Sequence, residues 1–354
     1  QRETDDLTGS LETLDRILAS SPAPRVEWSA RLERAFVLIY LGEGSTDDVL
    51  ATAEQAAGVF AEIGDESGLA TTWNAVGVEL FWRGKTSQMA DAFAKGLEHA
   101  RSARDDRREW SALNGLSIAL ALGPTPADDA AERIRANLVR AEELGPAALV
   151  TAVLAGVEAM CGRIDDAWLL YGRARELLGE PGSLIGGAGL LLYAEALLEL
   201  DPVRAAEELR PAYEALQGLG EKGVLATVAA FLAEALLTQG DLREAEELTR
   251  VSEQTAMSED VYSKVVWKRV RARVLARRGE DGRALALEAV ELARSAESPQ
   301  LLAGALVALA QVEQASGRSG EVELREALGL YEAKRNRPAS EQLRRALDLS
   351  LKTR

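Results

Sequence analysis

Apolar residues recur every three to four positions along most of the chain, in runs that end at a short glycine or aspartate turn. This is the period of an amphipathic α-helix, and no segment shows the sustained alternation of a half-buried strand. The turns lie 38 to 42 residues apart and are centred on Gly42, Gly84, Gly123, Gly162, Asp201, Gly240, Gly279 and Gly317. This regular spacing predicts an all-α solenoid of about eight helix-turn-helix repeats of about 39 residues.

Small residues follow several turns at a constant distance. Alanine stands five residues after the turn glycine at Ala167, Ala245 and Ala284, and Ala205 holds the equivalent place after Leu200. The distance between packed helices depends on the side chains at their contact, so a small residue lets the second helix approach the first closely.

The unit around Gly84 combines these small residues with aromatic and apolar ones at fixed offsets. Its characteristic positions are Trp73, Val76, Gly77, Leu80, Phe93 and Gly96. This pattern resembles the tetratricopeptide repeat. The resemblance implies a right-handed superhelix in which the first helix of each pair lines the concave side and the second helix lies on the convex side.

The two ends of the chain differ from the repeats. Leu7, Leu11, Leu14 and Leu18 form a weak amphipathic helix before a proline-rich break. We therefore expect an N-terminal capping helix and break at 1–25, a repeat solenoid at 26–334 and a C-terminal capping helix at 335–354. The chain begins without methionine, so we expect it to be an internal part of a longer protein.

Charge and cysteine content narrow the possible partners. A net charge of -16 argues against general affinity for nucleic acid or an anionic membrane, because phosphate binders need a basic surface. The single cysteine, Cys161, excludes an internal disulfide framework and fits a reducing compartment, so we expect a cytoplasmic protein. No run of about 18 apolar residues and no secretory signal pattern occurs.

Residues suited to catalysis or metal binding are few. His99 is the only histidine, and it is interpreted as a surface helix residue, while Cys161 is interpreted as a packed small side chain. The cluster Gly186–Gly189 lacks the lysine of a phosphate loop. Acid pairs stand where second helices begin, and their negative charges interact favourably with the positive end of the helix dipole. We therefore expect no catalytic, cofactor-binding or metal site.

One predicted helix is basic in an otherwise acidic chain. Residues 264–278 contain seven lysines and arginines and no acid. Three of them are spaced four apart and share one helix face, and these are Arg269, Arg273 and Arg277. The repeat register places this face in the concave groove, where it could receive an acidic protein or peptide. The alternative is salt bridging to acids of adjoining repeats, such as Glu234 or Glu313.

Longer stretches resemble one group of signalling proteins. They are residues 122–126, 208–216, 229–236, 266–279 and 330–334. They are similar to the C-terminal repeat region of bacterial, especially actinobacterial, proteins that carry a class III adenylate/guanylate cyclase domain and a signal-transducing AAA-type ATPase. LuxR-type activators share such repeats.

The resemblance implies a repeat arm that senses a ligand or partner and regulates the attached domains. It carries over no catalytic residue. A free-standing adaptor with a peptide-binding groove remains the alternative.

Overall fold

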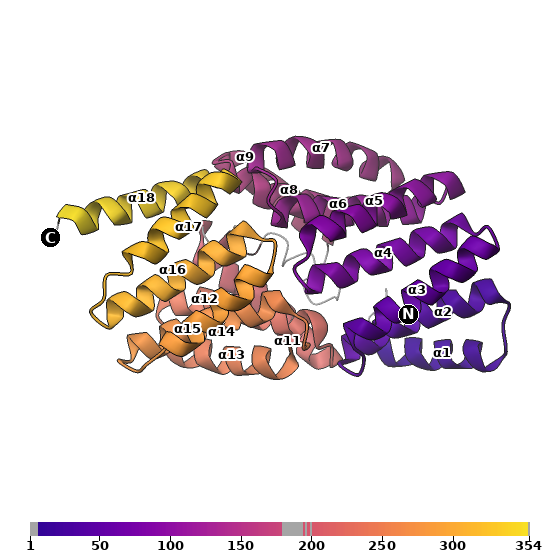
Figure 1. Cartoon of the computed structure of the whole chain (residues 1–354), viewed down its shortest axis with the longest axis horizontal. Coiled ribbons are helices and arrows are strands. Elements are labelled where there is room, and N and C mark those ends of the chain that lie inside the picture. The colour runs from indigo at the N-terminus through magenta and orange to yellow at the C-terminus, as the bar shows by residue number, and fades with distance from the viewer. Residues whose placement is uncertain (1–5, 179–193, 195–196, 199, 353–354) are drawn as a thin grey trace.

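The computed structural model describes residues 6–178, 194, 197, 198 and 200–352. Within them lie seventeen α-helices and no strand, so the predicted all-α repeat fold is confirmed. Figure 1 shows the helices arranged as antiparallel neighbours that follow one another around a superhelix. No helix of the described part is long and apolar enough to cross a membrane.

The helices form pairs joined at the predicted turns. The first helices are α2 (Pro24–Leu41), α4 (Glu66–Trp82), α6 (Asp106–Leu122), α8 (Ala148–Met160), α12 (Gly223–Gln239), α14 (Val261–Arg277) and α16 (Pro299–Ala315). The second helices are α3 (Thr46–Glu62), α5 (Thr86–Ala103), α7 (Ala127–Leu144), α9 (Ile164–Leu178), α11 (Pro202–Leu219), α13 (Leu242–Thr255), α15 (Arg283–Ser295) and α17 (Glu321–Lys334). The remaining two helices flank the pairs and are α1 (Leu7–Ala19) and α18 (Arg337–Lys352).

Packing between pairs follows one rule along the stack. First helices of successive pairs pack against each other, as α12, α14 and α16 do, whereas each second helix packs mainly on its own first helix and the next one. The first helices therefore lie closer together and form the inner side of the curve. In α12 every residue from Gly223 to Leu237 except Glu234 is buried, which places this helix at the centre of the largest apolar core.

Close approach of helices in the second and third pairs depends on two glycines. The ring of Phe93 on α5 lies against both Gly77 and Gly115, where an added Cβ would stand 2.6 Å and 2.3 Å from ring atoms. No side chain fits at either distance without displacing the ring. The repeat pattern around Gly84 therefore reflects the packing of one aromatic residue between two first helices.

We expect Gly115→Ala to lower the free energy of unfolding by about 1 to 3 kcal/mol, because the methyl group overpacks a filled core. Chemical denaturation followed by circular dichroism measures the change. The control is Gly172→Ala on α9, where an added Cβ meets nothing within 4 Å. It should be neutral or stabilising by roughly 0.5 to 1 kcal/mol. Equal losses in both variants would contradict the packing role of Gly115.

Several helices begin at a side chain that accepts a backbone hydrogen bond. Asp260 caps α14 by accepting from the Ser263 amide at 3.0 Å. Ser45 and Asp48 form a reciprocal capping box on α3. Three of the four expected acid pairs lie in first turns, on α3, α7 and α9. Asp260 differs from the other aspartate caps because it is fully buried, and its Oδ2 has no hydrogen-bond partner among the described residues.

Burial raises the pKa of Asp260 to about 6, so its charge opposes folding at neutral pH. The folded chain holds this proton between pH 3.8 and about 6 while the unfolded chain does not, and the contribution to stability falls as pH rises through that window. Asparagine caps helices equally well. We therefore expect Asp260→Asn to raise the unfolding free energy at pH 7 by roughly 1 to 3 kcal/mol, with a smaller effect at pH 4.

Thermal unfolding across pH 4 to 7 measures this difference between wild type and variant. Asp241→Asn is the matched control, because Asp241 caps α13 in the same way but is exposed. A pH-independent difference for Asp260→Asn would contradict burial of a charged cap.

The superhelix also contacts itself, which the sequence pattern did not indicate. Lys222 N donates to Tyr40 O at 2.9 Å, and Glu297 N donates to Gly84 O at 2.9 Å. Lys334 Nζ donates to Gly123 O at 2.7 Å. These partners are more than 180 residues apart, and we call this line of contacts the seam. In Figure 1 the indigo and purple N-terminal helices meet the orange and yellow C-terminal helices there.

Candidate binding cleft

A cleft of about 630 Å³ opens on the inner side of the C-terminal half. Its walls come from first helices α12, α14 and α16, and from α17 and α18. Polar side chains from these helices line it together with apolar ones, including Glu234, Thr238, Arg269, Arg273, Gln300, Gln311, Gln314, Gln342, Val307, Leu324 and Leu343. The cleft therefore offers amide, guanidinium and apolar groups to a bound segment.

The structure places the predicted arginines at and beside this cleft. Arg269 Nε lies 2.9 Å from Glu234 Oε2, and Arg273 Nη1 pairs with the other oxygen of the same carboxylate. Both arginines line the cleft. Arg277 does not, because its Nη1 donates to Leu237 O at 2.6 Å. The shared helix face thus divides into two cleft residues and one that ties α14 to α12.

Glu234 is the acid that the structure brings to these arginines. Glu313, the other candidate, instead pairs with Arg283 at 2.7 Å and with Arg318. Although burial favours the protonated form, Arg273 and Arg269 lower the pKa of Glu234 to about 2. The carboxylate is therefore ionised at neutral pH and engages two guanidinium groups at once.

The site retains an excess of positive charge. Arg269, Arg273 and the carboxylate of Glu234 leave a net charge of about +1 on the cleft lining, and the other side chains that line the cleft are uncharged. Burial and the charge of Arg273 lower the pKa of Arg277. Arg273 Nε is buried and has no hydrogen-bond partner among the described residues. An anion in the cleft would meet uncompensated positive charge.

Gly304 on α16 allows Arg269 its position. An added Cβ at Gly304 would stand 2.4 Å from Arg269 Nη1, so the guanidinium lies directly against the α16 backbone. Arg269 is only 8% exposed. The sequence showed the charge of this residue but not the glycine, 35 positions later, that makes room for it.

The other residues considered from sequence lie elsewhere. His99 Nδ1 lies 2.7 Å from Glu66 Oε2 on the helix surface. Cys161 is buried, and burial raises the pKa of its thiol to about 11, which leaves it protonated and unreactive at neutral pH. Among the described residues, no group of three or more histidine, cysteine or acidic side chains could hold a metal ion. Gly186–Gly189 lies outside the described residues.

Comparison with known proteins finds no family model that matches the chain and no match among curated proteins. Several solved structures share the helical repeat arrangement. A Rap protein complexed with competence and sporulation factor is 13% identical over 92% of this chain and 98% of that chain, with a TM-score of 0.48. The human IFIT1 dimer with m7Gppp-AAAA is 16% identical over 98% of this chain and 73% of that chain, with a TM-score of 0.39.

Yeast Tom70 is also 16% identical, over 99% of this chain and 87% of that chain, with a TM-score of 0.37. These likenesses are remote. They extend to a stack of helices and indicate nothing about a ligand of this protein.

Proposed function

We propose that this chain is a protein-interaction and regulatory repeat arm without chemistry of its own, and that its cleft binds an acidic segment of a partner. The observation that supports the proposal is the cleft lining with a net charge of about +1, in a protein whose overall charge is -16. Such a local reversal of sign attracts acidic ligands and orients them on approach.

The arrangement of Glu234 prepares the site for a carboxylate. It holds Arg269 and Arg273 in place on one side, and both arginines line the cleft. Guanidinium groups bind carboxylates with two parallel hydrogen bonds and stay charged at any physiological pH. The neutral amides of Gln311, Gln314 and Gln342 can form hydrogen bonds with the backbone of the bound acidic segment.

A direct test uses a labelled hexaglutamate peptide as the probe and fluorescence anisotropy as the measurement. The variant combines Glu234→Ala, Arg269→Ala and Arg273→Ala, so that no buried carboxylate is left without its arginines. We expect at least a tenfold loss of affinity, since two charge-assisted contacts are removed. Wild-type affinity should fall as salt rises, and this dependence should weaken in the variant.

The matched control removes the same residue types from an exposed site. Glu27, Arg31 and Arg34 lie on the surface of α2, where Arg31 pairs with Glu27 and Arg34 with Asp15. Replacing all three by alanine gives the same change in net charge. Equal affinities of the two triple variants for hexaglutamate would show that overall charge, and not the cleft, determines binding.

The wider setting of the arm is a further part of the proposal. Its resemblance to cyclase–ATPase proteins supports a cytoplasmic arm that regulates such domains in a longer chain, and a LuxR-type activator or a free-standing adaptor is the alternative. The gene distinguishes them. Upstream cyclase or P-loop coding sequence in frame supports the arm, a downstream helix-turn-helix supports the activator, and a start codon directly before Gln1 supports the adaptor.

A further inference from the structure

The loop between α17 and α18 connects the two halves of the molecule through basic side chains. Lys334 is fully buried, and its ammonium group donates to three backbone carbonyls at the end of α6 and in the α6–α7 turn. The acceptors are Leu120 O at 3.2 Å, Gly123 O at 2.7 Å and Thr125 O at 2.8 Å. An ammonium has three donors, so Lys334 uses all of them across the seam.

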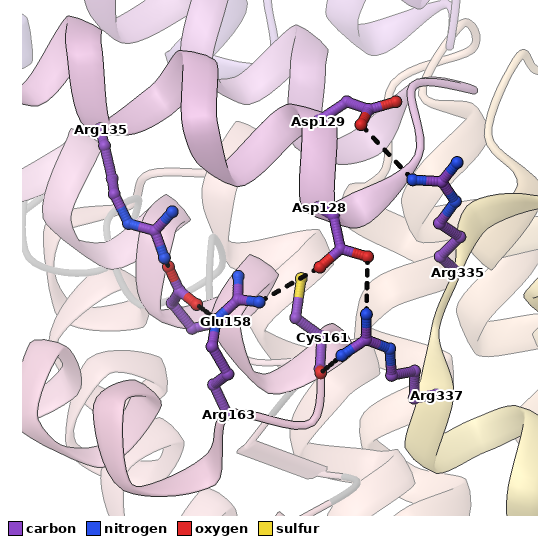
Figure 2. Close-up of polar contacts among 8 residues, drawn as sticks. All are labelled: Asp128, Asp129, Arg135, Glu158, Cys161, Arg163, Arg335 and Arg337. Atoms are coloured by element: carbon purple, nitrogen blue, oxygen red, sulfur yellow. Dashed lines mark hydrogen bonds and ion pairs between the residues drawn. The ribbon is translucent and has the colours of Figure 1, made fainter.

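Two arginines add ion pairs to α7 of the same helix pair, and one of them, Arg337, also reaches the neighbouring pair. Figure 2 shows Arg335 beside Asp129 and Arg337 beside Asp128. Arg335 Nη1 lies 3.4 Å from Asp129 Oδ1, and Arg337 Nη2 lies 2.9 Å from Asp128 Oδ2. Arg337 also donates to Cys161 O at 2.9 Å, at the end of α8. Asp128, Asp129 and Cys161 all belong to the N-terminal half, so this short basic segment holds two separate helix pairs.

The same segment begins one wall of the cleft. Asn336 caps α18 by accepting from the Ala339 amide at 3.2 Å, and it donates to Gln300 Oε1 at 3.3 Å. Gln300 lines the cleft, as do Gln342 and Leu343 of α18. The position of α18, and with it the width of the cleft, is therefore set where residues 334–337 meet the N-terminal half.

We propose that residues 334–337 are a conformational latch, which holds the two halves of the superhelix together and keeps α18 against the cleft. Arg335 and Arg337 are about half exposed. Exposed ion pairs contribute little each and are screened by salt, so the arginine contacts can open without unfolding the helices. Lys334 is the buried residue of the latch, and its ammonium group binds the α6–α7 turn. The inference goes beyond the proposed function and does not depend on the identity of any ligand.

Hydrogen exchange of the full chain, followed by mass spectrometry, tests the latch. In the double variant Arg335→Ala/Arg337→Ala we expect exchange to rise about three- to tenfold, as the loss of two exposed ion pairs allows. The rise should occur together in α18, in cleft helix α16 and in the first turn of α7. High salt should move wild-type exchange toward that of the variant.

The matched control is Arg344→Ala/Arg345→Ala, which removes two exposed arginines of α18 that pair with Glu332 and Glu341 and do not cross the seam. It should leave exchange in α7 and α16 unchanged. Lys334→Met should raise exchange in the same three regions by more than the double variant does. The latch is refuted if exchange rises in α18 alone, or if the control variant reproduces the full pattern.

Discussion

Replacing Glu234 by glutamine is expected to lower the free energy of unfolding by about 3 to 5 kcal/mol, because it leaves buried arginines without their counter-charge. Glu234 accepts from Arg269 and pairs with Arg273, and the two arginine side chains are only 10% and 13% exposed. Glutamine keeps the shape of the side chain but offers one acceptor oxygen and no charge. Urea denaturation at pH 7 measures the loss.

The pH dependence of stability gives a second reading of the same variant. Arg273 and Arg269 overcome the effect of burial and lower the pKa of Glu234 to about 2 in the folded chain, against 4.5 ordinarily. Its stabilisation is therefore complete above pH 4.5 and is lost as pH falls toward 2. The free energy of unfolding of the glutamine variant should not show this decrease as the pH falls from 4.5 toward 2.

Glu313 provides the matched control for Glu234. It also pairs with two arginines, Arg283 and Arg318, but those side chains are about half exposed. Glu313→Gln should therefore cost only about 0 to 1 kcal/mol for each pair. Adding Arg273→Met to Glu234→Gln should recover part of the lost stability. Similar losses for Glu234→Gln and Glu313→Gln would show that burial of the arginines does not decide the cost.

Stability and binding should respond to Glu234→Gln in opposite directions. The variant raises the positive charge of the cleft and frees donors on Arg269 and Arg273, so we expect its affinity for hexaglutamate to increase under conditions where it remains folded. A purely structural role for these arginines would lower stability without that gain.

Local features of this fold could be predicted from the sequence. The turn at Gly84 ends one helix because its φ of +67° suits glycine, and the spacing of such turns fixes the pairs. Gly77 and Phe93 fit the repeat pattern in the sequence, and in the structure the ring of Phe93 packs directly on Gly77. The cleft was only partly predicted, since Glu234 on α12 and Glu313 on α16 both lie one repeat from α14 in the chain. Spacing alone could not decide between them.

The seam could not be predicted from the sequence, and the reason is physical. Its position depends on the small rotation between successive repeats, summed over about five of them, and no local pattern contains that sum. Lys334 illustrates the difficulty. In the sequence it is a basic residue in the last turn of a helix, where an exposed ammonium group would interact favourably with the negative end of the helix dipole. In the structure it is 0% exposed and bonded to a turn more than 200 residues earlier.

Lys334→Met is accordingly expected to lower the free energy of unfolding by about 2 to 4 kcal/mol, since three carbonyl groups lose their donor in a buried place. Methionine matches the length of the side chain and fills the space with an apolar group. Burial lowers the pKa of Lys334 to about 8, so the folded chain releases this proton before the unfolded chain does. Wild-type stability should therefore gain a rising contribution from pH 8 to 10.5, which the variant lacks.

Arg335→Met is the matched control, because it changes the neighbouring residue of the same loop at a side chain that is 52% exposed. Its cost should stay within about 1 kcal/mol. Urea denaturation of both variants at pH 7 and pH 9.5 separates the two contributions. If Lys334→Met proved as stable as the wild type at pH 7, the free-energy cost of burying the ammonium group would equal the stabilisation by its three hydrogen bonds. The seam would then be held by its backbone contacts at Tyr40 and Gly84 instead.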